Sequence, residues 1–230
     1  QKVINGMPNL VMKIGFSGTP LDGSQESALN VEGTFGDILV DITNQEMIAA
    51  GVSSETKVVV FRIPYIMSKC SYKSAKELVY KSTRRLRKLV EIIEQADKEI
   101  LIVVQELKHG EWLKFNLPNT WNIPILHGKV KQKDKEKMLE AFYAGEYKAM
   151  IATSVIQEGV DTQNVRSIVY MLGGESEIKL KQTIGRGLRK KEENNTLTVY
   201  DFFDYIQHFQ EQAEERIKIY EQEGFPIEYK

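Results

Sequence analysis

Short apolar runs alternate with longer amphipathic stretches along most of this chain. Runs of this kind are typical of strands that are buried on both faces of a parallel sheet. They predict strands at residues 10–16, 56–64, 99–104, 123–127, 150–151, 168–172 and 197–200. Stretches with helical spacing follow several of them, at residues 75–96, 134–145, 176–190 and 204–223. Strands that alternate with helices predict an α/β fold, with a mostly parallel sheet covered by helices on both faces.

The stretch at residues 75–96 predicts one helix with an apolar face and a basic face. The apolar face consists of Leu78, Ser82, Leu86, Leu89 and Ile93. The basic face consists of Lys81, Arg84, Arg85 and Lys88. A solvated charged face is the ordinary interpretation of such a helix, and a surface that follows a phosphate backbone is the alternative.

The helix predicted after Ser176 carries a polar face suited to a polyanion. Leu180, Ile184 and Leu188 are spaced four residues apart and form its buried stripe. A second face carries Gln182, Arg186 and Arg189, because positions i, i+4 and i+7 lie on one side of a helix. Guanidinium groups are always charged and bind phosphate oxygens in a bidentate fork.

The segment that contains these residues, QTIGRGLRK, resembles motif VI of superfamily 2 helicases, Gln-x-x-Gly-Arg-x-x-Arg. The upstream segment ATSVIQEGVD resembles their motif V, at the usual order and separation. The resemblance implies a RecA-like lobe of the P-loop NTPase type, the second of the two lobes in such helicases. It also implies ATP with Mg²⁺, held mainly by the first lobe.

The resemblance assigns roles to individual residues. Arg189 would be the arginine finger, with Arg186 beside it on the γ-phosphate, so both are candidate catalytic residues. The candidate ATP-binding residues are Gln182, Gly159 and Asp161. Asp161 is also interpretable as a loop-capping acid. The candidate nucleic-acid-binding residues are Thr153, Ser154, His127 and Gly128, the last two because a strand that ends in His-Gly precedes motif V in the family.

Near the start, Ser17-Gly18-Thr19-Pro20 resembles helicase motif III, with Gly18 in place of the usual alanine. In the family, the hydroxyls of this motif couple the ATP site to the nucleic-acid track between the lobes, which implies that role for Ser17 and Thr19. Residues 33–36 and 44–51 resemble the lobe-joining segment of phage helicases that remodel branched DNA. We therefore expect residues 1–54 to be the tail of a first lobe and residues 55–230 to be the second lobe.

Two motifs of the first lobe do not occur in these 230 residues. There is no Gly-x-x-x-x-Gly-Lys-Ser/Thr loop and no Asp-Glu-x-Asp/His tetrad. We expect that the chain alone does not hydrolyse ATP and that its partner is a first helicase lobe, in cis or in trans. Whether the chain is a fragment or one part of a split protein stays open.

Composition adds limits on compartment and metal binding. The chain is 42% hydrophobic and 27% charged, with no apolar run that approaches a membrane span. A single cysteine, Cys70, fits a reducing compartment. Together with the resemblance to phage helicases, this implies the cytoplasm of a bacterium or a phage-infected host cell. Three scattered histidines predict no zinc site. The net charge of -1 does not argue against nucleic acid, since positive charge gathers at residues 69–88 and 129–137.

The function that the resemblance implies is that of an ATP-dependent helicase or translocase acting on DNA rather than RNA, with branched DNA or R-loops as candidate substrates. This chain would supply the arginine finger and half of the nucleic-acid track. Two alternatives stay open: a lobe that binds nucleic acid without hydrolysing ATP, and the motor of a restriction system or of an RNA helicase. The spacing of Arg186 and Arg189 favours the motor, because a pure binding module has no need of that pair.

Overall fold

The computed structural model describes residues 12–17, 25–66, 69–96, 99–153, 165–171 and 196–230. Contacts divide the chain into two compact units, residues 1–43 and residues 44–230. The first unit contains helix α2 (Gln25–Phe35). The second begins with α3 (Asn44–Ala49) and contains the sheet. The predicted lobe boundary, between residues 54 and 55, stays a prediction.

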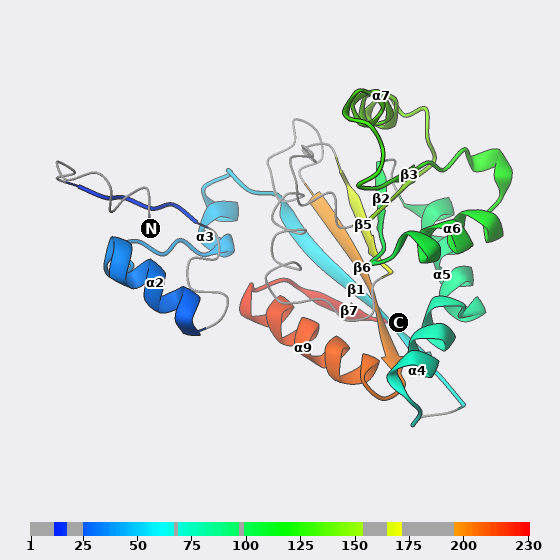
Figure 1. Ribbon diagram of the computed structural model, residues 1–230, viewed down its shortest axis with the longest axis horizontal. Coiled ribbons are helices and arrows are strands. Elements are labelled where there is room, and N and C mark those ends of the chain that lie inside the picture. The colour runs from blue at the N-terminus through cyan, green and yellow to red at the C-terminus, as the bar shows by residue number, and fades with distance from the viewer. Residues whose placement is uncertain (1–11, 18–24, 67–68, 97–98, 154–164, 172–195) are drawn as a thin grey trace. The chain divides into compact units, whose positions relative to one another are not determined.

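Among the described residues, seven strands form one sheet, and every pairing in it is parallel (Figure 1). The strands are β1 (Glu55–Pro64), β2 (Ile100–Val103), β3 (Ile125–Leu126), β4 (Met150–Ala152), β5 (Ser167–Tyr170), β6 (Thr196–Tyr205) and β7 (Ile227–Tyr229). Their order is β3-β4-β2-β5-β6-β1-β7. This confirms the predicted α/β class and the RecA-like, parallel arrangement.

Helices cover both faces of the sheet. The helices of the second unit after α3 are α4 (Tyr72–Tyr80), α5 (Thr83–Gln95), α6 (Leu107–Asn116), α7 (Gln132–Tyr143) and α9 (Phe209–Gln222), and a short 3₁₀ turn spans Asn119–Trp121. Side chains of α5 and α6 pack against one face, and side chains of α7 and α9 pack against the other.

Strand β1 shows how the sequence builds both halves of the core. Its successive valines alternate between the faces, as side chains on any strand do. Val58 and Val60 join the cluster under α7 and α9, whereas Val59 and Phe61 join the cluster under α5 and α6. Burial on both faces explains why β1 and β2 read as continuous apolar runs.

Helix α6 was not predicted, because its sequence has weak helical periodicity. It approaches the sheet closely at Gly110. A Cβ placed there would lie 3.1 Å from Cγ2 of Ile151 and 3.4 Å from Cγ2 of Val104. The glycine therefore lets the helix rest directly on β4 and the end of β2.

Three predicted elements need correction. Residues 12–17 form no strand and are exposed, and no strand partner lies among the described residues of their unit. The single helix predicted at residues 75–96 is two helices, because Ser82 has an extended backbone and its side chain accepts a hydrogen bond from the Arg85 amide, which starts α5. The predicted helix at 204–223 begins only at Phe209, since β6 continues to Tyr205.

The C-terminal strand β7 was not predicted. Helix α9 ends at Gln222, and Gly224, with a positive φ of 71°, follows its C-cap and lets the chain turn back to pair with β1. The helix predicted after Ser176, together with its arginines, lies outside the described residues.

Candidate nucleotide and nucleic-acid site

The described residues include only part of the predicted site. Seven candidate residues lie outside them: Thr19, Ser154, Gly159, Asp161, Gln182, Arg186 and Arg189. Four are described, Ser17 in the first unit and His127, Gly128 and Thr153 in the second. Ser17 is exposed.

His127 and Thr153 come together where two neighbouring strands end. Strands β3 and β4 are parallel, with Leu126 opposite Ala152. The residues that follow are therefore neighbours at the carboxyl edge of the sheet, and the Thr153 amide donates a hydrogen bond to the Leu126 carbonyl at 3.0 Å. This edge of an open parallel sheet is the usual location of a ligand site.

At the carboxyl edge of β3 and β4, hydrogen bonds hold the backbone in place, while some residues are exposed to solvent. Gly128 is exposed and His127 is half-buried. The His127 carbonyl accepts a hydrogen bond from the Val130 amide at 3.1 Å, which closes the turn after β3. Thr153 is 8% exposed. A tight turn with an exposed glycine leaves main-chain groups accessible to a phosphate backbone, which such groups contact without reading sequence.

A second group of side chains lies after β2. The Tyr80 hydroxyl donates to Oε1 of Gln105 at 3.1 Å, and Lys76 forms an ion pair with Glu106. Both contacts tie α4 to the segment that leads into α6. The carboxyl end of β2 is thereby joined to the helix layer.

His109, on the first turn of α6, is buried at 2% exposure. Its ring stacks on Tyr80, with centroids 4.1 Å apart and planes 7° apart. Burial, with the positive charges of Arg85 and Lys76, lowers the pKa of His109 to about 3. His109 is therefore a neutral ring in the core at neutral pH.

Strand β6 places two carboxylates inside the protein, one on each face of the sheet. Asp201 and Asp204 are three positions apart, so their side chains point to opposite faces. Arg216 of α9 holds Asp201 in a fork, with Nε at 2.8 Å from one carboxylate oxygen and Nη2 at 3.0 Å from the other. The Tyr220 hydroxyl also donates to Asp201 at 2.8 Å. Burial alone would lower the pKa of Arg216, but the charge and hydrogen bond of Asp201, with smaller contributions from Tyr220 and Tyr170, raise that pKa overall.

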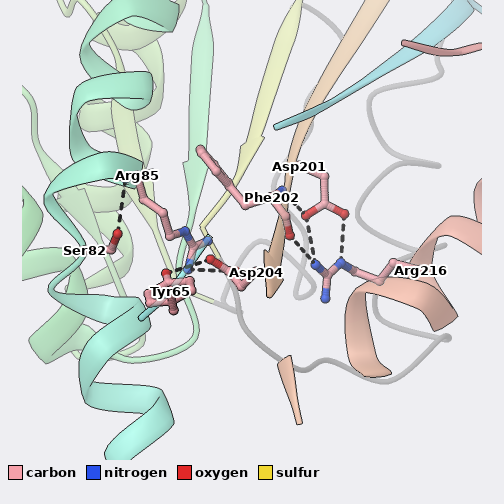
Figure 2. Close-up of polar contacts among 7 residues, drawn as sticks. All are labelled: Tyr65, Ser82, Arg85, Asp201, Phe202, Asp204 and Arg216. Atoms are coloured by element: carbon pink, nitrogen blue, oxygen red, sulfur yellow. Dashed lines mark hydrogen bonds and ion pairs between the residues drawn. The ribbon is translucent and has the colours of Figure 1, made fainter. Parts of the chain in front are cut away.

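On the other face, Asp204 meets Arg85 of α5 and Tyr65 (Figure 2). Nη1 of Arg85 lies 3.7 Å from Asp204, and the Tyr65 hydroxyl donates to Asp204 at 2.8 Å. The Arg85 guanidinium also lies over the Phe202 ring, 4.6 Å from its centroid. Burial raises the pKa of Asp204, and it also raises the pKa of Tyr65, with the Asp204 charge adding to it.

These two ion pairs fix β6 to both helix layers. Figure 2 shows Arg85 and Arg216 approaching the strand from opposite sides. Arg85 had been assigned to the exposed basic face of a helix, and this was wrong, since its side chain is buried. The sequence carried one signal of the buried carboxylates, namely two aspartates inside the apolar run of β6, and it gave no sign of which arginines would reach them.

Two further properties concern the part of the chain that the structure describes. No group of three or more His, Cys, Asp or Glu side chains there gathers closely enough to hold a metal ion. None of the described helices has the length and apolar character needed to cross a membrane.

Comparison with known proteins identifies proteins to which this chain is similar. Residues 83–191 match the model of the helicase conserved C-terminal domain. The chain is 25% identical over 213 residues to the ATP-dependent DNA helicase UvsW of Enterobacteria phage T4, covering 88% of this chain and 42% of UvsW. It is 29% identical over 116 residues to the DNA 3'-5' translocase XPB2 of Sulfurisphaera tokodaii, covering 50% of this chain and 26% of XPB2. The chain thus spans less than half the length of either relative.

Solved structures show the same fold. The crystal structure of T4 UvsW has a TM-score of 0.64 at 18% identity, over 88% of this chain and 44% of that one. A fragment described as the HsdR subunit of a type I restriction enzyme from Vibrio vulnificus has a TM-score of 0.70 at 15% identity, over 90% of this chain and 42% of that one. The chain therefore has the RecA-like fold of superfamily 2 helicase C-terminal lobes and is similar in sequence to UvsW, with the helicase conserved C-terminal domain matched at residues 83–191.

Proposed function

We propose that this chain forms the C-terminal part of an ATP-dependent helicase or translocase that acts on DNA, with branched DNA or R-loops among its substrates. The observation that carries the proposal is the similarity to an ATP-dependent DNA helicase over 88% of the chain. XPB2, a DNA translocase, is a second relative of the same kind. Such a motor would act in the cytoplasm of a bacterium or a phage-infected cell, and the similarity to a phage helicase supports this.

In this proposal, Arg186 and Arg189 bind the γ-phosphate of ATP, and Gln182 contributes an amide beside them. Two guanidiniums and an amide fit this ligand, since such groups complement phosphate oxygens. Gly159 and Asp161 would lie near the ribose and the interlobe switch. ATP with Mg²⁺ supplies the phosphoryl group that is transferred to water. The role of Arg189 is to stabilise the charge that develops on that group.

The carboxyl edge of β3 and β4 is the proposed nucleic-acid track. His127, Gly128 and Thr153 lie there, and Ser154 is next in the sequence. Hydroxyls and main-chain amides bind phosphates without regard to sequence, as a translocating motor requires. The other half of the track would belong to the first lobe, to which residues 1–54, with Ser17 and Thr19, would couple this one.

ATP hydrolysis tests this proposal. We expect the 230-residue chain alone to hydrolyse ATP no faster than buffer, because it lacks the two first-lobe motifs that hold the triphosphate and magnesium. A first helicase lobe, supplied in cis or in trans, should produce turnover that DNA stimulates more than RNA. DNA-stimulated turnover by the purified chain alone would overturn the proposed division of labour. If the paired lobes bind DNA but never turn over ATP, the chain is a binding module instead.

A further inference from the structure

An aromatic side chain outside the proposed track is held firmly against the core while much of its surface is open. Tyr72, the first residue of α4, stacks on Phe209 with ring centroids 5.8 Å apart and planes 11° apart. It also meets the His208 ring edge-on, at 5.8 Å and 75°. Phe209 is 1% exposed, whereas Tyr72 is 42% exposed. The Tyr72 side chain is therefore held by core rings and is still substantially exposed to solvent.

The fold brings Tyr72 to the carboxyl edge of the sheet. Helix α4 packs over the turn between β6 and α9 through Ala75 and Val79, which contact Ile206 and Phe209. Figure 1 shows α4 beside the carboxyl end of β6 and the start of α9.

The proposed track lies along this same edge. β1 and β6 end together, with Pro64 opposite Tyr205, and β3 and β4 end at His127 and Thr153. From β3 to β1 the sheet order has five strand spacings, which amount to about 24 Å at about 4.8 Å each. A strand of nucleic acid that crosses the carboxyl edge from β3 would therefore arrive beside Tyr72.

Positive charge flanks the aromatic ring. Lys69 and Lys73 are exposed on either side of Tyr72 in the sequence, and Lys73 lies on the same helix. The nearest acidic residue of α4 is Glu77, and its carboxylate is paired with Lys81 at 2.6 Å. The segment from Lys69 to Ala75 contains no acidic residue, so the charge of this segment favours an anionic ligand.

We propose that Tyr72 is a stacking platform for one base of a single-stranded nucleic acid and that Lys69 and Lys73 contact the phosphates on either side of that base. The proposal rests on the proposed function, because it continues the strand that His127 and Thr153 would bind. Supported aromatic rings between lysines bind single strands in this way, without sequence preference, since every base has a π-face. Tyr72 would thereby add base contact to a track that otherwise contacts only the backbone.

The test is fluorescence anisotropy of a labelled oligothymidylate with the 230-residue chain, at several salt concentrations. Tyr72→Ala should weaken binding about 5- to 150-fold, the loss expected for one stacked base. Tyr72→Phe should bind like the wild type, because it keeps the ring. With an oligonucleotide that lacks bases at all positions, Tyr72→Ala and wild type should bind equally.

Substitution of the two lysines should change the salt dependence of binding. Lys69→Gln with Lys73→Gln should reduce the steepness of log K against log salt by about 1.4, since each phosphate contact on a single strand contributes about 0.7. Tyr72→Ala should leave that slope unchanged. The matched control is Lys114→Gln with Phe115→Ala, an exposed lysine and an aromatic residue with 85% exposure on the last turn of α6, at the opposite edge of the sheet. This control should change neither affinity nor slope.

The outcomes separate this proposal from the proposed function. If substitutions at His127 and Thr153 weaken binding while Tyr72→Ala does not, the track stands and the platform is wrong. If Tyr72→Ala alone weakens binding, the platform stands and the track is wrong. The platform is also overturned if the wild type binds no oligonucleotide at low salt, or if the Tyr72→Ala loss persists on the base-free oligonucleotide.

Discussion

At the scale of single residues, the second unit depends on charges buried in its core. Arg216 with Asp201 and Arg85 with Asp204 are all at most 3% exposed. Removing one member of such a pair leaves a buried charge without compensation and costs about 3–5 kcal/mol. The sequence identified none of these residues correctly, because a basic helix looks the same whether one arginine points outward or inward. Which arginine side chain is buried depends on which one faces a buried carboxylate of β6.

His109 makes stability depend on pH in a predictable direction. The pKa of His109 is about 3 in the folded protein and about 6.5 in an unfolded chain. Between these values the unfolded state binds the proton and the folded state does not, so stability falls as the pH is lowered from 6.5 toward 3. From pH 7 to pH 5 the loss should be about 2 kcal/mol.

Urea unfolding at a series of pH values measures this effect. His109→Phe keeps a ring against Tyr80 and removes the titrating group, so its pH dependence should be shallower than that of the wild type by that amount. Asp204 titrates in both proteins, and its contribution cancels in the difference. Tyr80→Phe is the control, since it loses the bond to Gln105 at every pH and should keep the wild-type slope. Equal slopes for wild type and His109→Phe would refute this account of His109.

At the scale of elements, the apolar runs located most of the sheet correctly, because a strand buried on both faces must be apolar throughout. Strands β1, β2, β3, β4 and β5 fall on predicted runs, and β6 starts on one and continues to Tyr205. The pattern failed where local chemistry interrupts a periodic stretch. Ser82 starts a new helix inside the predicted one, and the three-residue β7 is too short to carry a pattern. Its pairing with β1 depends on the turn after α9.

The two arginines at the start of α5 should behave in opposite ways. Arg84 is exposed, with Nη1 donating to the Pro64 carbonyl, whereas Arg85 is buried against Asp204 and Phe202. Arg85→Ala should therefore lower the free energy of unfolding by about 3–5 kcal/mol. Arg84→Ala should change it by about 0.5 kcal/mol or less, as surface substitutions do. Denaturant titration of both variants measures these changes in the free energy of unfolding. Equal losses would mean that α5 presents Arg85 to solvent, as the helical pattern had suggested.

At the scale of the whole molecule, the order of motifs V and VI predicted the helicase class, and the matched domain at residues 83–191 agrees with it. The sequence also predicted that the candidate residues His127 and Thr153 each follow a strand, and the pairing of β3 with β4 brings these two strand ends together. It did not predict the platform at Tyr72. That site arises from the packing of α4 over the start of α9, a contact between segments more than 130 residues apart in sequence.

The measurement that tests the central claim most directly is steady-state ATP hydrolysis by this chain, with Arg189→Ala, combined with a first helicase lobe. A finger acts on charge that develops in the transition state, so its loss should lower kcat at least about a hundredfold and leave KM nearly unchanged. Arg186→Lys should also lower kcat, because an ammonium cannot reproduce the planar fork. Arg62→Ala, at an exposed arginine of β1, is the matched control and should turn over normally. Near-normal turnover with both Arg189→Ala and Arg186→Lys would contradict the claim that this lobe supplies the arginines of the ATP site.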